Sequence, residues 1–117
     1  MREDGKIDYV EFPGQDLTAL RGFYGKAFGW RFQDYGPSYM ALEGAGLDGG
    51  FDADAEARLS RPLVILYATD LEAMEQRVRA AGGVVTRAIF AFPGGRRFHF
   101  QDPSGNELAV WSDAPVA

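Results

Sequence analysis

An internal repeat constrains the fold of this chain more than any other feature of its sequence. The segment 16–20 reads Asp-Leu-Thr-Ala-Leu, and the segment 70–74, 54 residues later, reads Asp-Leu-Glu-Ala-Met. The same interval separates three further pairs downstream: Tyr24 and Val78, Ala27 and Ala81, and Gly29 and Gly83. Two copies of this length account for nearly all of the 117 residues. The fold is therefore expected to consist of two similar halves.

Both copies predict the same order of elements. An acidic start, an apolar stripe at three- and four-residue steps and a glycine stop predict helices over 17–28 and 71–81. Short β-type runs precede the helices at 7–12 and 63–67. Three more runs follow each helix, separated by Gly- and Pro-containing turns: 30–32, 39–42 and 47–51 in the first copy, and 84–92, 97–101 and 107–111 in the second. Each half is predicted to be βαβββ.

These elements predict an α+β protein of two βαβββ repeats. One helix covers one face of four strands, so the bare faces of two such sheets can curve around a shared hollow in a cupped mixed β-sheet with the helices outside. We expect a single domain over 7–113, with repeat 1 at about 7–52 and repeat 2 at about 62–113. A polar connector at about 52–61 joins the repeats, and residues 1–6 are expected to be a flexible N-terminus.

Composition excludes several classes of protein. A 46% hydrophobic content is sufficient for a core and argues against disorder, and a net charge of −5 disfavours binding to nucleic acid. The absence of cysteine excludes disulfides, thiolate nucleophiles and thiolate-ligated metals. No apolar run approaches the roughly 20 residues of a membrane span, or a signal-peptide core. We expect a cytoplasmic protein with neither a membrane nor a nucleic acid as its partner.

The two ends of the chain resemble one known family. The opening contains Tyr-Val-Glu-Phe-Pro at 9–13, Asp-Leu at 16–17, Phe-Tyr at 23–24 and Phe-Gly-Trp at 28–30, and the closing stretch 98–108 is Phe-His-Phe-Gln-Asp-Pro-Ser-Gly-Asn-Glu-Leu. Together they resemble the vicinal oxygen chelate superfamily, also called the glyoxalase/bleomycin resistance/extradiol dioxygenase superfamily, from about Ile7 to Trp111. The resemblance implies a glyoxalase-like fold, which hosts isomerases, lyases, dioxygenases, thiol transferases and non-catalytic drug-sequestering proteins.

The resemblance also implies where a divalent metal would be held. The family's ligand positions correspond here to Tyr9, Leu63 and Ala109, and to the stretch 47–51, in which Asp48 is the sole carboxylate. Leucine and alanine carry no donor atom, and a neutral tyrosine is a poor ligand for such an ion. We therefore expect neither a family-type metal nor a cofactor. The alternative is a relocated metal, with ligands drawn from Glu11, His99 and Glu107.

Strand alternation extends the inward-facing set implied by the resemblance. The candidate ligand-binding residues are Tyr9, Ile65, Tyr67, Arg97, Ala109 and Trp111, and the same face includes Glu11, His99 and Glu107, with Gln101 as a weaker candidate. Phe98 and Phe100 are expected to face the helix as core residues. The predicted pocket is thus aromatic and aliphatic, with a few polar groups.

His99 and Glu11 are the candidate catalytic residues. His99 titrates near neutrality and can act as a general acid or base, although a histidine between two phenylalanines is also compatible with a structural ring. An inward Glu11 carboxylate must be hydrated, paired or protonated, and its structural alternative is a salt bridge to Arg96 or Arg97. These two arginines can equally bind an anionic ligand group or form a charged hairpin shoulder.

Three function classes remain open. The first is binding of a small organic molecule in an apolar cup without a family-type metal. The second is a lyase or isomerase similar to glyoxalase I, using a relocated metal or acid–base chemistry by His99 and Glu11. The third is a non-catalytic dimerisation module. A homodimer is expected in each case, because a small chain with two exposed sheet edges favours pairing and family members often complete the cup across the interface.

Overall fold

The structure of the protein is a computed structural model, which describes residues 2–54 and 61–115. Its elements follow the predicted order: β1 (Ile7–Pro13), α1 (Leu17–Phe28), β2 (Arg31–Asp34), β3 (Tyr39–Glu43), β4 (Gly49–Asp52), β5 (Leu63–Tyr67), α2 (Leu71–Ala80), β6 (Val84–Phe92), β7 (Gly95–Gln101) and β8 (Glu107–Ser112). Each predicted helix and strand is confirmed to within a few residues. Of the predicted connector, residues 55–60 lie outside the described part.

Both helices begin at the predicted aspartates. The Asp16 carboxylate accepts a hydrogen bond from the Ala19 N–H at 3.0 Å, and Asp70 does the same for Ala73 at 3.0 Å. The first helix ends at the predicted Gly29, which has the left-handed φ of 75°. In the second copy Gly82 takes the left-handed conformation, at φ 100°, one residue before the predicted stop.

The chain divides into two compact units. The first-repeat unit is formed by residues 9–63, and the second-repeat unit by the described residues of 1–8 and 64–117. The N-terminal segment joins the second-repeat unit through backbone hydrogen bonds: the Gly5 N–H donates to the Tyr67 carbonyl at 2.8 Å, and the Tyr67 N–H donates to the Lys6 carbonyl at 3.2 Å. Flexibility of residues 1–6 stays a prediction.

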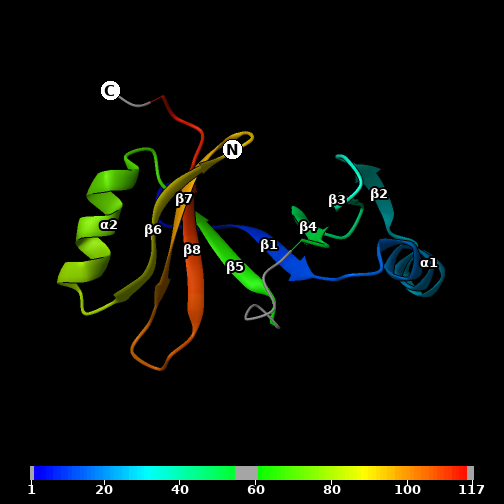
Figure 1. The fold of residues 1–117 in the computed structure, drawn as a ribbon, viewed down its shortest axis with the longest axis horizontal. Helices are drawn as coiled ribbons and strands as arrows, with labels where there is room; N and C mark the ends of the chain where they lie inside the picture. Colours follow the sequence, from blue (N-terminus) through cyan, green and yellow to red (C-terminus); the bar gives the residue numbers. More distant parts are fainter. Residues whose placement is uncertain (1, 55–60, 116–117) are drawn as a thin grey trace. The chain divides into compact units, whose positions relative to one another are not determined.

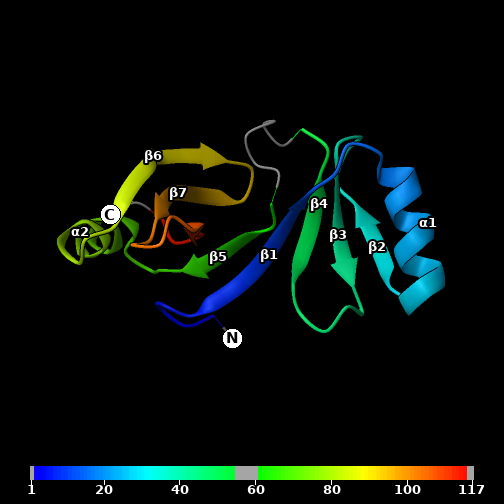
Figure 2. The ribbon, with the colours of Figure 1, turned by 90° about the horizontal axis from the view of Figure 1, so that it is seen from below.

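The first-repeat unit is a four-stranded mixed sheet with one helix. Its strand order is β2-β3-β4-β1, with β1 and β4 parallel and the other neighbours antiparallel. Figure 2 shows these strands with α1 alongside β2. Phe51, Met40 and Leu42 form the buried cluster, against which Leu20 and other apolar residues of α1 pack. The amphipathic stripe of the helix therefore covers one face of the sheet, as predicted.

The second-repeat unit repeats this arrangement. Its order is β5-β8-β7-β6, with β5 and β8 parallel, and α2 lies beside its sheet (Figure 1). Phe98, Val110 and Leu71 are buried together on the helix side, and Phe100 packs against them. The expected orientation of Phe98 and Phe100 is confirmed, as is the α+β class with two βαβββ repeats. Neither helix of the described residues is long and apolar enough to cross a bilayer.

Candidate functional site

Six of the predicted site residues lie in two neighbouring rows of cross-strand partners in the second-repeat sheet. We call each such row, with one residue from each of β5, β8 and β7, a rung. In one rung Ile65 lies opposite Ala109, and Ala109 lies opposite His99; in the next, Tyr67 lies opposite Trp111, and Trp111 lies opposite Arg97. Residues paired across neighbouring strands share a face of the sheet. These six residues therefore occupy one face, opposite the one that carries Phe98 and α2.

His99 is the centre of the first rung. Its side chain is 0% exposed, and its Nδ1 lies 3.1 Å from Oε2 of Glu107. Since a carboxylate accepts hydrogen bonds, Nδ1 carries the proton in the neutral ring and Nε2 carries the lone pair. Nε2 is buried and has no hydrogen-bond partner among the described residues. The ring is thus oriented at one nitrogen and available for an additional bond at the other.

The surroundings keep this imidazole neutral. Burial lowers the pKa of His99 below its ordinary 6.5, and the nearby positive charges of Arg97 and Arg87 act in the same direction. The hydrogen bond with Glu107 opposes these effects without reversing them. A neutral, buried histidine can accept a hydrogen bond or a proton at Nε2.

A turn in the closing motif places Glu107 near His99. The Asp102 carboxylate accepts hydrogen bonds from the backbone N–H groups of Ser104 and Asn106, both at 2.9 Å, and from the Asn106 side-chain amide at 2.8 Å. These bonds lower the pKa of Asp102, the Asn106 side chain contributing most. The turn sets Gln101 opposite Glu107. The Asp-Pro-Ser-Gly-Asn segment therefore acts structurally, by fixing the register of β7 and β8.

Strand β6 takes part in three arginine–aromatic contacts, one through its own Arg87 and two with Arg97 of β7. Arg87 lies opposite His99 in the register, and its guanidinium carbon is 3.7 Å from the Phe90 ring centroid. The guanidinium carbon of Arg97 lies 5.5 Å from the same centroid and 5.6 Å from that of Phe92. Arg87, Phe90 and Phe92 were not predicted to lie here. Irregular pairing between Val85 and Arg87 and between Arg87 and Phe90 interrupts the regular alternation of β6.

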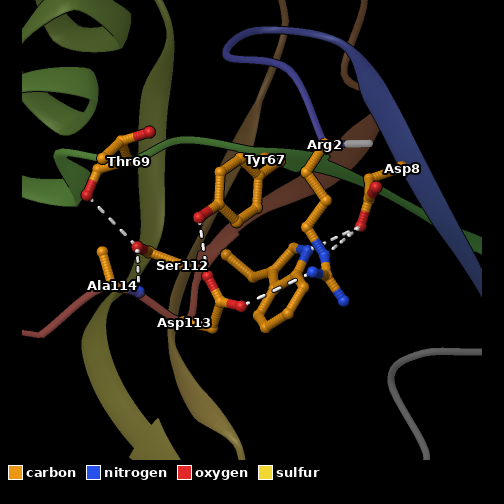
Figure 3. A network of polar contacts seen from close by, with 8 residues as sticks. Arg2, Asp8, Tyr67, Thr69, Ser112, Asp113 and Ala114 are labelled. Carbon is orange, nitrogen blue, oxygen red and sulfur yellow. Dashed lines mark hydrogen bonds and ion pairs between the residues drawn. The ribbon is translucent and has the colours of Figure 1, made fainter.

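The second rung ends in a polar network shown in Figure 3. The Tyr67 hydroxyl donates to Oδ1 of Asp113 at 2.6 Å, and this bond raises the pKa of Tyr67. The Trp111 Nε1–H donates to Oδ2 of Asp8 at 3.0 Å. Arg2 lies against both rings. None of the three charged residues was predicted, since each lies outside the motifs that carry the resemblance.

Tyr9 and Glu11 lie in the first-repeat unit, where Tyr39 links them. The Tyr39 hydroxyl contacts the Tyr9 hydroxyl and donates to Oε2 of Glu11 at 3.4 Å. Burial raises the pKa of both tyrosines, so both hydroxyls remain protonated at neutral pH. Gly50 accommodates the Tyr39 ring, because a Cβ at that position would lie 2.3 Å from the hydroxyl oxygen. No sequence motif indicated Tyr39.

Arg96 forms a salt bridge with Glu72 of α2. Its guanidinium nitrogens lie 2.5 and 3.2 Å from the two carboxylate oxygens of Glu72 on α2. This bidentate contact raises the pKa of Arg96 and lowers that of Glu72. Arg96 is therefore paired with Glu72 within its own unit, and a salt bridge of Glu11 to Arg96 or Arg97 stays a prediction.

The donor set does not fit the metal that the resemblance implies. Leu63 and Ala109 offer no donor atom, and the raised pKa of Tyr9 keeps that residue in its poorly ligating neutral form. Within residues 2–54 and 61–115 no group of three or more His, Cys, Asp or Glu side chains could hold a metal ion. The relocated set of Glu11, His99 and Glu107 takes its residues from both units and stays a prediction.

Comparisons with solved structures show the same fold in proteins of different function. A glyoxalase/bleomycin resistance protein/dioxygenase superfamily member from Vibrio splendidus has a TM-score of 0.71 at 21% identity, over 92% of this chain and 98% of that one. Methylmalonyl-CoA epimerase from Mycobacterium tuberculosis has a TM-score of 0.71 at 16% identity, over 97% and 91%. An NAD-dependent benzaldehyde dehydrogenase from Legionella pneumophila has a TM-score of 0.72 at 14% identity, over 89% and 96%.

Sequence comparison identifies the family. No curated protein sequence matches the chain. The family model described as Glyoxalase/Bleomycin resistance protein/Dioxygenase superfamily matches residues 6–110, a span that contains every strand of both repeats except the last residues of β8. The chain therefore belongs to the glyoxalase/bleomycin resistance protein/dioxygenase superfamily.

Proposed function

We propose that the protein binds a small organic molecule on the helix-free face of the second-repeat sheet, without a family-type metal. The observation that carries this proposal is Nε2 of His99, which is buried and has no hydrogen-bond partner among the described residues. An unpaired buried polar atom costs about 1–3 kcal/mol. A ligand that donates a hydrogen bond to Nε2 would recover that cost.

The neighbours of His99 indicate what else the ligand carries. Ile65 and Ala109 supply apolar contact, and the nearby guanidiniums of Arg87 and Arg97 favour a carbonyl or anionic oxygen. We therefore propose a hydroxy acid, phenol or amide of modest size. Tyr67 and Trp111 in the adjacent rung are proposed to bind the same molecule. Tyr9 is proposed as a ligand-binding residue within the first-repeat unit.

His99 is the sole histidine of the chain, so selective labelling reports on this site directly. In protein labelled with ¹⁵N-histidine, Nε2 should have the resonance of a neutral, unprotonated nitrogen. A panel of small hydroxy acids, phenols and amides is then titrated, and a ligand that donates to Nε2 should shift this resonance saturably. Glu107→Gln keeps an acceptor oxygen near Nδ1 and is the matched control, in which binding should persist.

Native mass spectrometry of the purified protein complements the titration by detecting any retained ligand. If no panel compound moves Nε2 and no small molecule is retained, the binding proposal is wrong. The dimerisation module would then be the better account of the protein.

A lyase or isomerase reaction is the second candidate, and the state of His99 favours it. A neutral imidazole whose Nδ1–H is held by a carboxylate is the arrangement of a general base. Glu11, whose carboxylate accepts a hydrogen bond from the Tyr39 hydroxyl, is proposed as a second acid–base residue, in the first-repeat unit. With a turned-over compound in hand, His99→Asn or Glu11→Gln should lower kcat by about 10²–10⁴-fold. Unchanged turnover in both variants would reject these roles.

We also propose that the protein is a cytoplasmic homodimer. Strands β2 and β6 each end the strand order of their sheet, and exposed sheet edges favour pairing. Sedimentation velocity at micromolar concentrations should give the mass of two chains. A species of 12.8 kDa at every concentration would contradict this proposal.

A further inference from the structure

We propose that Tyr67, Trp111, Asp8 and Asp113 form a binding site for an organic cation, namely a guanidinium or methylated ammonium group. In this structure the site is held by Arg2 of the same chain (Figure 3). We call these four residues the cation cage. The cage shares the Tyr67 and Trp111 rings with the site proposed around His99. The inference rests instead on the carboxylates of Asp8 and Asp113, which select a positive charge, and on the contacts of Arg2.

Two aromatic rings form the walls of the cage. The guanidinium carbon of Arg2 lies 4.9 Å from the Trp111 ring centroid and 5.9 Å from the Tyr67 ring centroid. The two ring centroids are 5.5 Å apart, and the ring planes make an angle of 77°. The two distances from the Arg2 guanidinium carbon to the ring centroids lie within the approximately 6 Å over which a ring attracts a cation. Two nearly perpendicular rings therefore contact one cation.

Two carboxylates complete the cage, and each is held by one of the rings. Arg2 Nε lies 3.6 Å from Asp8 Oδ2, and an Arg2 terminal nitrogen lies 3.5 Å from Asp113 Oδ2. Asp8 accepts the indole N–H of Trp111, and Asp113 accepts the hydroxyl of Tyr67. These two hydrogen bonds do not involve Arg2. The cage is thus ordered by its own members and should persist when Arg2 leaves.

Arg2 is held loosely enough to be replaced. Its side chain is 50% exposed and that of Asp113 is 41% exposed. Contacts of 3.5–3.6 Å are longer than direct charge-assisted hydrogen bonds, and exposed ion pairs contribute little stability. Arg2 therefore acts as a weak intramolecular competitor, with an effective concentration in the millimolar range for a short tether.

The chemistry of the cage selects among cations. Guanidinium and methylated ammonium groups are weakly hydrated and contact aromatic faces readily, whereas a primary ammonium is strongly hydrated. The carboxylates of Asp8 and Asp113 repel anions. The expected ligand is therefore an organic cation whose remaining part extends into solvent or along the sheet.

The test uses the two tryptophan indole N–H signals of the full chain in ¹⁵N-labelled protein. Trp30→Phe removes the other signal and so assigns that of Trp111. Methylguanidinium is titrated at constant ionic strength into the wild type, Arg2→Ala and the double variant Arg2→Ala with Asp113→Asn. Methylurea, which is neutral and similar in shape, is the control ligand. Arg21→Ala is the matched control variant, because it removes a guanidinium that contacts Phe32 and Asp34 in the other unit.

We expect methylguanidinium to shift the Trp111 signal saturably in Arg2→Ala, with affinity about tenfold or more above that of the wild type and of Arg21→Ala. Adding Asp113→Asn to Arg2→Ala should reduce this affinity, and methylurea should have no effect. Equal affinities in wild type and Arg2→Ala, equal shifts with methylurea, or no saturable shift in Arg2→Ala would each overturn the proposal. Because the readout is Trp111, failure here leaves the His99 titration unaffected, and the reverse holds.

Discussion

The two repeats share a scaffold but differ in how their polar groups are satisfied. In the first repeat, Tyr9, Tyr39 and Glu11 form a connected set of hydrogen bonds within one unit. In the second, His99 is bonded at Nδ1, while Nε2 has no partner in the described part of the chain. The difference separates a polar cluster whose hydroxyls are bonded within their unit from one that leaves a buried ring nitrogen without a partner among the described residues, which is where we propose that a ligand binds.

Equivalent strands show where the repeats diverged. Tyr9 and Glu11 on β1 correspond, at the 54-residue interval, to Leu63 and Ile65 on β5. These two aliphatic side chains are each 3% exposed. The polar chemistry of the second repeat lies instead on β7 and β8, where the closing turn fixes its register. The two repeats therefore share the same backbone arrangement but have polar side chains on different strands.

The largest expected effect comes from breaking the first-repeat cluster at Gly50. In Gly50→Val the new Cβ would lie 2.3 Å from the Tyr39 hydroxyl oxygen and 2.5 Å from the adjoining ring carbon, so the ring must move. Overpacking of this kind costs about 1–3 kcal/mol, measurable by urea unfolding. Gly22→Ala is the control, because a Cβ there meets nothing within 4 Å and should stabilise α1. Equal effects of both changes would contradict the assigned role of Gly50.

Acidification should destabilise the protein through the second-repeat histidine. The pKa of His99 is lower in the folded state than its ordinary 6.5, so the unfolded chain binds the proton more tightly. The contribution of neutral His99 to the free energy of unfolding is fully present above pH 6.5. It is lost as the pH falls from 6.5 towards the pKa of His99 in the folded state. The slope is at most about 1.4 kcal/mol per pH unit, the limit for one proton.

Urea unfolding between pH 7.5 and 5.5 measures this slope. In His99→Gln the slope should be smaller, since the chain then contains no histidine. A slope that is the same in both proteins would show that His99 is not the titrating group.

Tyr39→Phe removes the hydroxyl that joins Tyr9 to Glu11 in the first repeat. Loss of this half-buried hydrogen-bonding group should lower the free energy of unfolding by about 1 kcal/mol. Tyr35→Phe is the control, because that side chain is 65% exposed and its hydroxyl can be hydrated. Comparable losses in the two variants, determined by urea unfolding, would show that the cluster adds no stability of its own.

The smallest effect distinguishes the two helix starts. Asp16→Ala and Asp70→Ala each remove a capping carboxylate and should cost about 0.5–1 kcal/mol. The loss should be larger by a few tenths of a kcal/mol at Asp16, because the first turn of α2 retains the acidic Glu72 and the first turn of α1 has no acidic residue. Thermal unfolding of both variants, at equal pH and salt concentration, tests whether Asp16→Ala loses more stability than Asp70→Ala.

Local patterns predicted the fold because they act over a few residues. The capping aspartates and apolar stripes located both helices. The family resemblance placed His99 on the inward face of its strand, and alternation from there placed Phe98 on the helix side. No face was predicted for the residues of β6, whose irregular pairing places Arg87 opposite His99. Tyr39 also escaped prediction, because its role depends on the space above Gly50 on the neighbouring strand.

The amino-acid order by itself determined the repeat, the order of elements, the family and the lack of a donor atom at Leu63 and Ala109, two of the implied metal positions. Each of these depends on which residue follows which, or on side-chain chemistry alone. The tertiary structure decided which polar atoms are satisfied: Asp8 by Trp111, Asp113 by Tyr67, and His99 at one nitrogen. Asp8 and Trp111 are brought together from opposite ends of the chain, and hydrogen bonding requires an approach within about 3 Å that sequence spacing does not specify.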